Sequence, residues 1–459
     1  MSIIPVFLWS DILIYALMLS SAAWAYFALR REYWRIALRQ VGGNRMAMLS
    51  FGVLCLYGSL GLLDTIHFKR VSAENPKGGN ITSLFDLLAQ PLIERTETTY
   101  SAPFATHSFS MESVQRNGQQ VREFPRLAHA AINLKDPASD AAADIEKRAV
   151  TGLGLGLAIG LALFIFSWGI LSLMRRSNGS NGRHGTNGTS NLYWLGGFMT
   201  VVAILVSEAV TLNMNEGYHI LGTDKTGQDV FYLALKSIRT GLIVGTLTTL
   251  IVTPFAVFFG ILAGYFGGWV DDLIQYVYTT LSSIPDILLI AAAMLMLQTW
   301  LAQTQVETLV SADNRLILLC VILGITSWTG LCRLIRGEVL KLREVEYIQA
   351  ADAFGVGRLT IMVRHLLPNV MHIVLISVVL RFSGLVLTEA ILAYIGIGVD
   401  PSTNSWGNMI NQARLELARD PVVWWSILAA FTFMLGLVLP ANLFGDAVRD
   451  ALDPRLKTR

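Results

Sequence analysis

Apolar runs of about 20 residues recur along the chain and are separated by polar segments. A helix needs roughly that length to cross the hydrocarbon core of a membrane, so each run is a candidate span. The candidate spans cover residues 6–29, 46–66, 151–174, 192–213, 241–264, 284–302, 315–335, 370–398 and 422–444. The pattern therefore predicts an all-α polytopic membrane protein with about nine transmembrane helices.

Composition agrees with a membrane protein. Hydrophobic residues make up 53% of the 459 residues and charged residues only 15%, with a mean hydropathy of +0.52, whereas soluble domains carry about 25% charged residues. Cys55, Cys320 and Cys332 all fall inside apolar runs without a CxxC pair, which predicts packing residues and neither a disulfide nor a metal site. The run 6–29 is too long for a cleavable signal peptide and lacks its basic start, so we expect a retained span.

The basic residues orient the spans. Arginines outnumber acidic residues in 30–45, which predicts a cytoplasmic location for this segment. The N-terminus then lies outside, each later span reverses direction, and the C-terminus is cytoplasmic. The arginines that follow the third span, the stretch 343–369 and the C-terminal tail all fall on the same side, which makes the topology self-consistent.

Four regions follow from this topology. Residues 1–66 carry the first two spans, 67–150 form an exterior (periplasmic) insertion, 151–213 hold two further spans, and 214–459 form the core. The insertion has as many basic as acidic residues and scattered turn residues, so we expect partial order. A Gly/Asn/Ser-rich run at 177–191 is typical of a flexible cytoplasmic linker.

The stretch 343–369 is polar although apolar runs flank it on both sides. Tyr347, Ala350, Ala351 and Phe354 recur at a spacing of three or four residues, which predicts a short helix with one apolar stripe. Gly355 is a typical helix end. A second short helix is expected over 358–366, stopped by a proline at 368. An ordinary solvated loop is the alternative, but such loops are usually short and lack a helical stripe, which favours a surface that a partner grips.

Two further segments are rich in turn residues. The loop Gly222, Thr223, Asp224, Gly227 and Asp229 has the glycine spacing of a phosphate loop, but Gln228-Asp229 replaces the required Lys-Ser/Thr, so a nucleotide site is excluded. We expect an exterior loop, followed over 230–241 by an amphipathic segment along the membrane interface. In 264–290, three glycines at 264, 267 and 268 predict a cytoplasmic turn. We expect the acidic residues 271–272 in the headgroup zone. An ordinary membrane hairpin without a specific function would have the same pattern.

Charged residues inside spans are costly and often functional. The candidates are Glu208, Arg381 and Glu389. Glu208 lies near a span end, where its carboxylate can reach the interface. Arg381 and Glu389 are eight residues apart on one span, so they either line an internal pathway or pair with a neighbouring helix.

These motifs together resemble the inner-membrane permeases of ATP-binding-cassette importers of the dipeptide/oligopeptide (nickel) class. The family's EAA loop has Glu-Ala-Ala, three residues, Gly, nine residues and Ile-x-Leu-Pro; here it is Gln349-Ala350-Ala351, Gly355 and His365-Leu366-Leu367-Pro368. The segment HILGTDKTGQDV resembles the family's His-Pro-Leu-Gly-Thr-Asp-x-x-Gly-Arg-Asp-Val. GYFGGWVDDLI, SIPDILL, 389–410 and 445–457 agree as well. Gln349 and His365 depart from the EAA pattern, and an Arg-His before Leu-Pro favours the peptide branch.

The resemblance implies a type I importer-permease fold over 214–459, of the second-permease type with an extended N-terminal region. It assigns ATPase coupling to the EAA loop at 344–368, with Glu346, Gln349, Ala350, Ala351, Gly355, Arg364, His365 and Pro368 as its site residues. It implies an inner-membrane subunit that is not an enzyme, with no cofactor of its own and ATP and Mg²⁺ at partner subunits. The implied partners are a second permease (as a heterodimer), two cytoplasmic ATPases, a periplasmic substrate-binding protein and membrane lipid, without nucleic acid.

Other functions fit less well. Permeases of this class also serve nickel or other small solutes, so the substrate stays open. An ion-coupled secondary transporter would need intramembrane ion sites, usually in repeated halves, and the sequence has no convincing internal repeat. A membrane-embedded enzyme would need a motif such as HExxH, which the chain lacks.

Overall fold

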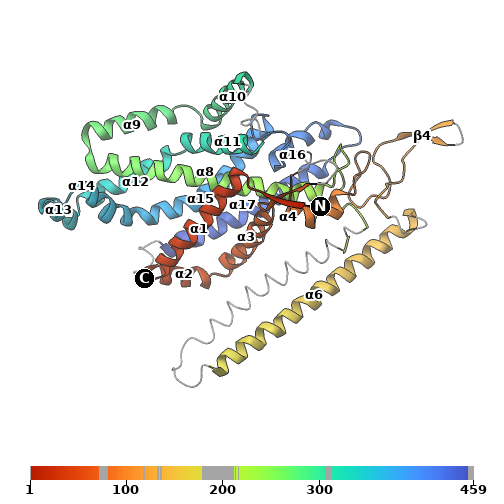
Figure 1. Cartoon of the computed structure of the whole chain (residues 1–459), viewed down its shortest axis with the longest axis horizontal. Coiled ribbons are helices and arrows are strands. Elements are labelled where there is room, and N and C mark those ends of the chain that lie inside the picture. Colours follow the sequence, from red (N-terminus) through yellow and green to blue (C-terminus); the bar gives the residue numbers. More distant parts are fainter. Residues whose placement is uncertain are drawn as a thin grey trace.

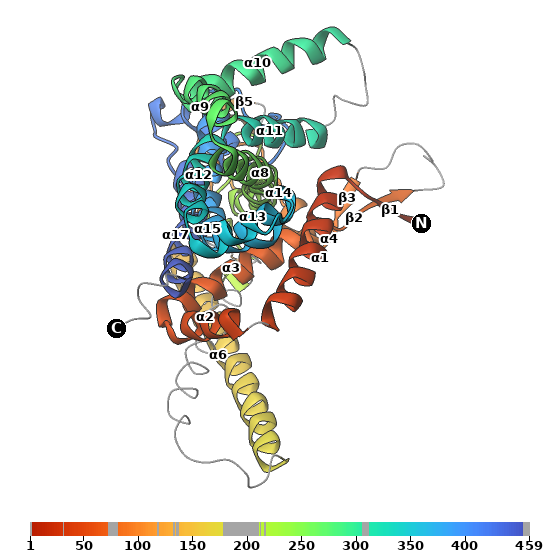
Figure 2. The ribbon, with the colours of Figure 1, turned by 90° about the vertical axis from the view of Figure 1, so that its left-hand side faces the viewer.

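The structure, a computed structural model, describes residues 2–30, 32–71, 81–116, 119–131, 134, 137–177, 211, 213–214, 217–304 and 312–452. Most of the expected span at 192–213, including Glu208, most of the expected linker at 177–191 and the end of the tail lie outside these residues. The helices of the C-terminal half run side by side as a bundle, against which the helices within residues 9–63 pack (Figures 1 and 2).

The N-terminal part alternates helices with short strands. Its elements are β1 (Ser2–Val6), α1 (Trp9–Leu29), α2 (Glu32–Gly43), α3 (Arg45–Leu63), β2 (His67–Val71), β3 (Ile81–Ser83), α4 (Leu84–Leu88), α5 (Gln90–Ile93), β4 (Glu112–Arg116), β5 (Gln119–Glu123) and α6 (Pro137–Ser177). The strands form an antiparallel sheet β1-β2-β3 and a separate β4-β5 hairpin. The predicted helical class is confirmed, and the small sheets are an addition that the span pattern did not predict.

The C-terminal part begins with a long helix. Its elements are α8 (Val230–Phe266), α9 (Gly268–Ser282), α10 (Asp286–Thr304), α11 (Ala312–Thr326), α12 (Thr329–Arg343), α13 (Glu346–Ala353), α14 (Arg358–Thr360), the π-helix η2 (Ile361–Leu366), α15 (Leu367–Tyr394), α16 (Trp406–Ala413), the 3-10 helix η3 (Glu416–Ala418) and α17 (Trp425–Leu452).

Within the described residues, five helices are long and apolar enough to cross a membrane, and a sixth crossing is possible if the bent pair α9–α10 forms one span. The five are Arg45–Leu63, Val230–Phe266, Ala312–Arg343, Arg358–Tyr394 and Trp425–Leu452. The pair α9–α10 bends by 86° at the break before Asp286. Helix α1 holds a shorter apolar stretch, Trp9–Ala23, and the predicted span 151–174 lies inside α6.

Three local predictions were wrong. The segment 230–241 is not a separate interfacial helix, because α8 continues through it and buries Val230, Ala234 and Ile238 in the bundle. Pro368 does not end a helix: the wider π turn of η2, in which Leu367 N donates to Met362 O, leads directly into α15 with the proline in its first turn. Gly264 is helical, and the turn after α8 uses only Gly267 and Gly268, both at positive φ.

Helices α8 and α12 pack closely against each other in the core. A Cβ added to Gly260 would lie 2.8 Å from Ile335 Cβ, and one added to Gly264 would lie 2.7 Å from Val339 Cβ. The two glycines are four residues apart on one face of α8, and such spacing lets two helix backbones approach closely. A buried apolar cluster surrounds this contact and extends to α13 and α15.

Ion pairs join the N-terminal region to α8. Lys236 Nζ lies 2.7 Å from Asp64 Oδ1 and also contacts Asp86. Asp86 forms a capping box with Ser83 at the start of α4. Three residues further along α8, Arg239 Nη2 lies 2.7 Å from the fully buried Asp11 of α1. A polar cavity of about 500 Å³ lies between these groups. Burial raises the pKa of Asp86, but Lys236 outweighs it and holds the pKa below its usual range.

We expect Lys236→Met to loosen the N-terminal region from the bundle. Removing one partner of a largely buried ion pair leaves uncompensated carboxylates and costs roughly 3–5 kcal/mol. The side chain of Lys236 is only 16% exposed, whereas Lys341, which also has an acidic partner, is 73% exposed. Limited proteolysis should cut 81–131 faster in Lys236→Met, with Lys341→Met cut at the wild-type rate. Equal rates for all three proteins would show that the ion pairs do not attach this region.

Candidate coupling helix and exterior loop

Helix α13 lies at one end of the bundle, between the helix ends of α12 and α14 (Figures 1 and 2). The predicted short helix is therefore confirmed. It follows α12 after only two residues, Glu344 and Val345, of which Val345 is extended. Because the connection is short, a displacement of α13 would also displace the end of α12.

The end of α13 is built by backbone geometry. Gly355 has φ +74°, and its N–H donates to Asp352 O at 2.9 Å. The next residue, Val356, donates to Ala351 O at 3.1 Å. This pair of hydrogen bonds is a Schellman motif, which requires a left-handed residue after the helix. The predicted role of Gly355 as the helix end is confirmed.

The two faces of α13 differ in what they contact. Ile348 is 2% exposed and belongs to the apolar cluster of α8, α12 and α15. Tyr347 and Phe354 of the predicted stripe are 45% and 86% exposed. An exposed phenylalanine beside the small, exposed Ala350 leaves a surface on which a partner can pack closely, whereas Ala351 is partly buried against the apolar cluster. One face thus anchors the helix and the other is available.

The remaining EAA-loop residues lie around this helix. Glu346 is exposed in the first turn of α13, where a carboxylate interacts favourably with the helix dipole. Gln349 Nε2 lies 3.4 Å from Glu344 Oε2. The ring of His365 lies beside Tyr347, whose hydroxyl accepts from Asn369 Nδ2 at 2.9 Å. Arg364 and Pro368 are exposed on the η2–α15 side.

A bidentate ion pair ties α9 to the same end of the bundle. Arg336 of α12 donates from Nε and Nη2 to the two carboxylate oxygens of Asp271 at 2.6 and 2.7 Å. The fork geometry fixes the relative orientation of two helices as well as their distance. Asp271 is 8% exposed and paired with Arg336, and its expected position in the headgroup zone stays a prediction.

Arg381 and Glu389 do not form a common site. Arg381 Nη1 donates at 2.6 Å to the backbone oxygen of Ser327, in the break between α11 and α12. This contact favours the interpretation that Arg381 pairs with a neighbouring helix, since it satisfies a carbonyl freed by that break. Glu389 is 1% exposed on α15. A role for either residue in a translocation pathway stays a prediction.

The loop from Gly222 to Asp229 contacts part of the segment 67–150, which was predicted to be an exterior insertion. Thr223 Oγ1 donates to Thr99 O at 2.8 Å and accepts from Ser101 N at 2.7 Å. A Cβ on Gly227 would lie 1.8 Å from Glu97 O, so only glycine fits there. Asp224 Oδ1 accepts from the backbone N–H of Thr226 and Gln228 and closes the turn. The backbone of residues 97–101 therefore packs directly on this loop.

A buried histidine joins this loop to the insertion. His219 Nδ1 lies 2.8 Å from Asp229 Oδ2, and Nε2 lies 3.5 Å from Glu97 Oε1. Asp229 also caps α8 by accepting from Phe231 N at 2.8 Å. Burial alone would lower the pKa of His219, but the hydrogen bond to Asp229 and the neighbouring Glu97 raise it to about 9. His219 is therefore cationic between two carboxylates at neutral pH.

Three contact residues were not predicted from the sequence: Ile348, Glu97 and His219. Ile348 lies beside the predicted stripe, next to Ala351, and a large hydrophobic residue there was a signal for anchoring. His219 was part of the exterior motif but had no assigned partner, because Glu97 is far away in the chain. No local pattern indicated that Glu97 would meet it.

A membrane helix bundle with a polar helix exposed between two of its long helices is typical of a transport subunit driven by a partner. Residues 256–458 match the family model described as binding-protein-dependent transport system inner membrane component. The chain is 32% identical over 251 residues to the oligopeptide transport system permease protein of Haemophilus influenzae, covering 55% of this chain and 74% of that protein. It is 33% identical over 248 residues to the glutathione transport system permease protein of Pectobacterium atrosepticum (53% and 76%). It is 29% identical over 239 residues to the dipeptide transport system permease protein of Bacillus subtilis (52% and 69%).

The chain belongs to the family of inner-membrane permease components of binding-protein-dependent transport systems, the ATP-binding-cassette importers. The predicted family is thus confirmed, and the chain is a multi-pass inner-membrane subunit of a multi-subunit importer that works with ATPases and a substrate-binding protein.

We expect the exterior contact to weaken as the pH rises from 6.5 through about 9. A histidine whose pKa is raised in the folded state contributes stability that is complete below its unfolded pKa and is lost above its folded pKa. The shift corresponds to roughly 3 kcal/mol. Amide hydrogen exchange of 97–109, corrected for the intrinsic pH dependence, should lose protection over this range. In His219→Gln, protection should be lower throughout and independent of pH; wild-type protection that stays constant from pH 6.5 to 10 would contradict the assignment.

Proposed function

We propose that the chain is the permease subunit of a peptide importer and that α13 is the helix through which partner ATPases drive it. The observation that carries this proposal is the two-faced geometry of α13, with Ile348 in the bundle core and Phe354 exposed. The substrate class is supported by the relatives, whose names refer to oligopeptide, dipeptide and glutathione transport.

The mechanism follows from how α13 is attached. Closure of the ATPases around ATP displaces α13. The helix moves as a rigid unit, because the Schellman turn at Gly355 keeps it helical to its last residue. Ile348 passes the displacement to the cluster between α8, α12 and α15. Because α8 and α12 pack backbone to backbone and Arg336 holds α9, these helices move together, as in a switch between two discrete packed states.

The EAA-loop residues divide between docking and positioning. Ala350 and Phe354 form the surface that enters a groove of the ATPase, with the partly buried Ala351 at its edge. Glu346, Gln349 and Arg364 provide the polar rim. Gln349 stands where the family has glutamate, so the contact there is a hydrogen bond without a full charge. The ring of His365 packs against Tyr347 and holds it in position. Pro368 lies in the first turn of α15, the span that carries the displacement to Arg381.

The partners in this proposal are a second permease subunit, two cytoplasmic ATPase subunits and a periplasmic binding protein. ATP and Mg²⁺ are bound by the ATPases, and this chain catalyses no reaction. The binding protein delivers the substrate at the end of the bundle that carries Gly222–Asp229 and the insertion 67–150. The pairing of β1 with β2 supports an N-terminus on the same side as the insertion.

We expect Gly355→Val to lower uptake of a radiolabelled dipeptide about tenfold in cells that express the whole importer. A β-branched residue at positive φ is strongly disfavoured, so the turn that ends α13 is distorted. Gly357→Val is the matched control, since Gly357 has φ −58° and its nearest neighbour beyond a new Cβ is 3.9 Å away. Normal uptake in Gly355→Val would contradict the role of α13, whereas uptake of Ni²⁺ without dipeptide would contradict only the substrate class.

The proposed orientation predicts opposite labelling of two cysteines. Met111 is 60% exposed in the insertion, and Leu359 is 71% exposed beside α13. In intact spheroplasts, a membrane-impermeant maleimide should label Met111→Cys at once and Leu359→Cys only after lysis. The reverse pattern would show that α13 faces the exterior and cannot meet cytoplasmic ATPases.

A further inference from the structure

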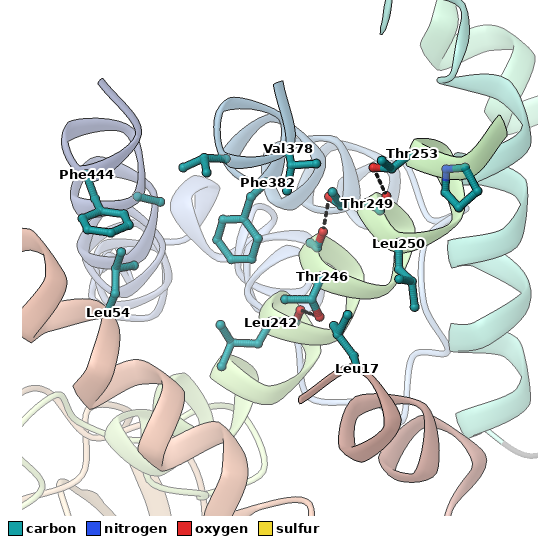
Figure 3. Close-up of a pocket in the computed structure, with 14 residues that line it drawn as sticks. Leu17, Leu54, Leu242, Thr246, Thr249, Leu250, Thr253, Val378, Phe382 and Phe444 are labelled. Atoms are coloured by element: carbon teal, nitrogen blue, oxygen red, sulfur yellow. Dashed lines mark hydrogen bonds between the residues drawn. The ribbon is translucent and has the colours of Figure 1, made fainter. Parts of the chain in front are cut away.

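An apolar cavity of about 490 Å³ lies between α1, α3, α8, α15 and α17. Figure 3 shows side chains from these helices around a common space, with Leu17 of α1 on one side and Phe382 of α15 on the other. Leu54, Leu242 and Phe444 complete the apolar wall. The cavity lies along the middle of these helices and not at either end of the bundle.

The polar side chains in the wall offer no free hydrogen-bond donor to a ligand. Thr246, Thr249 and Thr253 of α8 each donate to the backbone oxygen four residues earlier, at 2.6, 2.6 and 2.7 Å. These hydroxyls are therefore already bonded within the helix, as the dashed lines in Figure 3 illustrate. Water in a cavity needs two to four polar partners, so water is a poor occupant here.

An empty space of this size is also unfavourable. Apolar cavities lower stability in proportion to their volume, and this one is about three times an engineered cavity of roughly 150 Å³ that takes up benzene. The occupant must therefore be apolar and abundant around these helices. In a membrane bundle that is a lipid acyl chain, and Leu250 and Pro254 are exposed at the edge of the cavity, where a chain can enter from the side.

We propose that this cavity binds the acyl chain of a membrane phospholipid, which fills the space between α1 and the permease helices α8, α15 and α17. The acyl chain fills the space between α1 and the permease helices, since Leu17 of α1 lines one side of the cavity and Thr246 and Phe382 line the other. The headgroup stays outside the cavity, because the hydroxyl hydrogens of the lining are already donated within α8 and the rest of the wall is apolar.

The first test uses the full chain in nanodiscs of phosphatidylethanolamine and phosphatidylglycerol, followed by transfer to detergent and native mass spectrometry. The wild type should retain a tightly bound phospholipid. Leu17→Trp and Leu250→Trp fill the cavity and should lower its occupancy at least about fivefold, whereas Leu288→Trp, on an exposed position of α10, should retain it. Equal occupancy in all four proteins would overturn the proposal.

A second measurement does not depend on the folding of a tryptophan variant. A photo-crosslinking amino acid is placed at Leu250 in the assembled importer, with Leu288 as the reference position. The proposal predicts a phospholipid adduct at Leu250 that persists after extensive detergent washing, while the adduct at Leu288 is washed out before irradiation. A crosslink from Leu250 to another protein subunit would overturn the proposal, because it would identify a partner helix as the occupant.

Discussion

The close approach of α8 and α12 is the contact on which the rest of the bundle depends. Gly260 and Gly264 leave no room for a side chain, so the two backbones meet directly and Ile335 and Val339 pack over them. Any larger residue would separate the helices and open the cluster that also receives Ile348. Because Arg336 joins α9 to α12 through two hydrogen bonds, α8, α9 and α12 form one unit, and α13 is attached to its end.

The end of the bundle that carries the loop 222–229 is held together by different interactions. There the N-terminal region and the insertion are attached through buried charges: Asp11 to Arg239, Asp64 and Asp86 to Lys236, and Glu97 to His219. Such pairs are sensitive to geometry and to pH, whereas the glycine contact between α8 and α12 is not. The N-terminal region and the insertion are therefore attached to the bundle through charges, and this attachment can be weakened without disturbing the packing of α8 on α12.

The sequence was sufficient for features that depend on local pattern. The long apolar helices, the short helix ended by Gly355 and the family were all predictable, since each has a signature within a few residues or a fixed spacing. The continuous α8, the entry of η2 into α15 through Pro368 and the strand β1 beside β2 were not, because tertiary packing overrides local breaking signals. Partners far apart in the chain, such as Glu97 with His219 or Arg381 with Ser327, leave no local signal at all.

The central claim is that α13 has separate docking and anchoring faces, and Ile348→Ala tests it most directly. The substitution removes the buried side chain that joins α13 to the core but leaves Phe354, Ala350 and Ala351 unchanged. In the importer reconstituted with its ATPases and binding protein, we expect the ATPases to remain bound and to hydrolyse ATP, while dipeptide transport per ATP falls at least about tenfold. Transport per ATP at the wild-type level, or loss of the ATPases from the complex, would contradict the account.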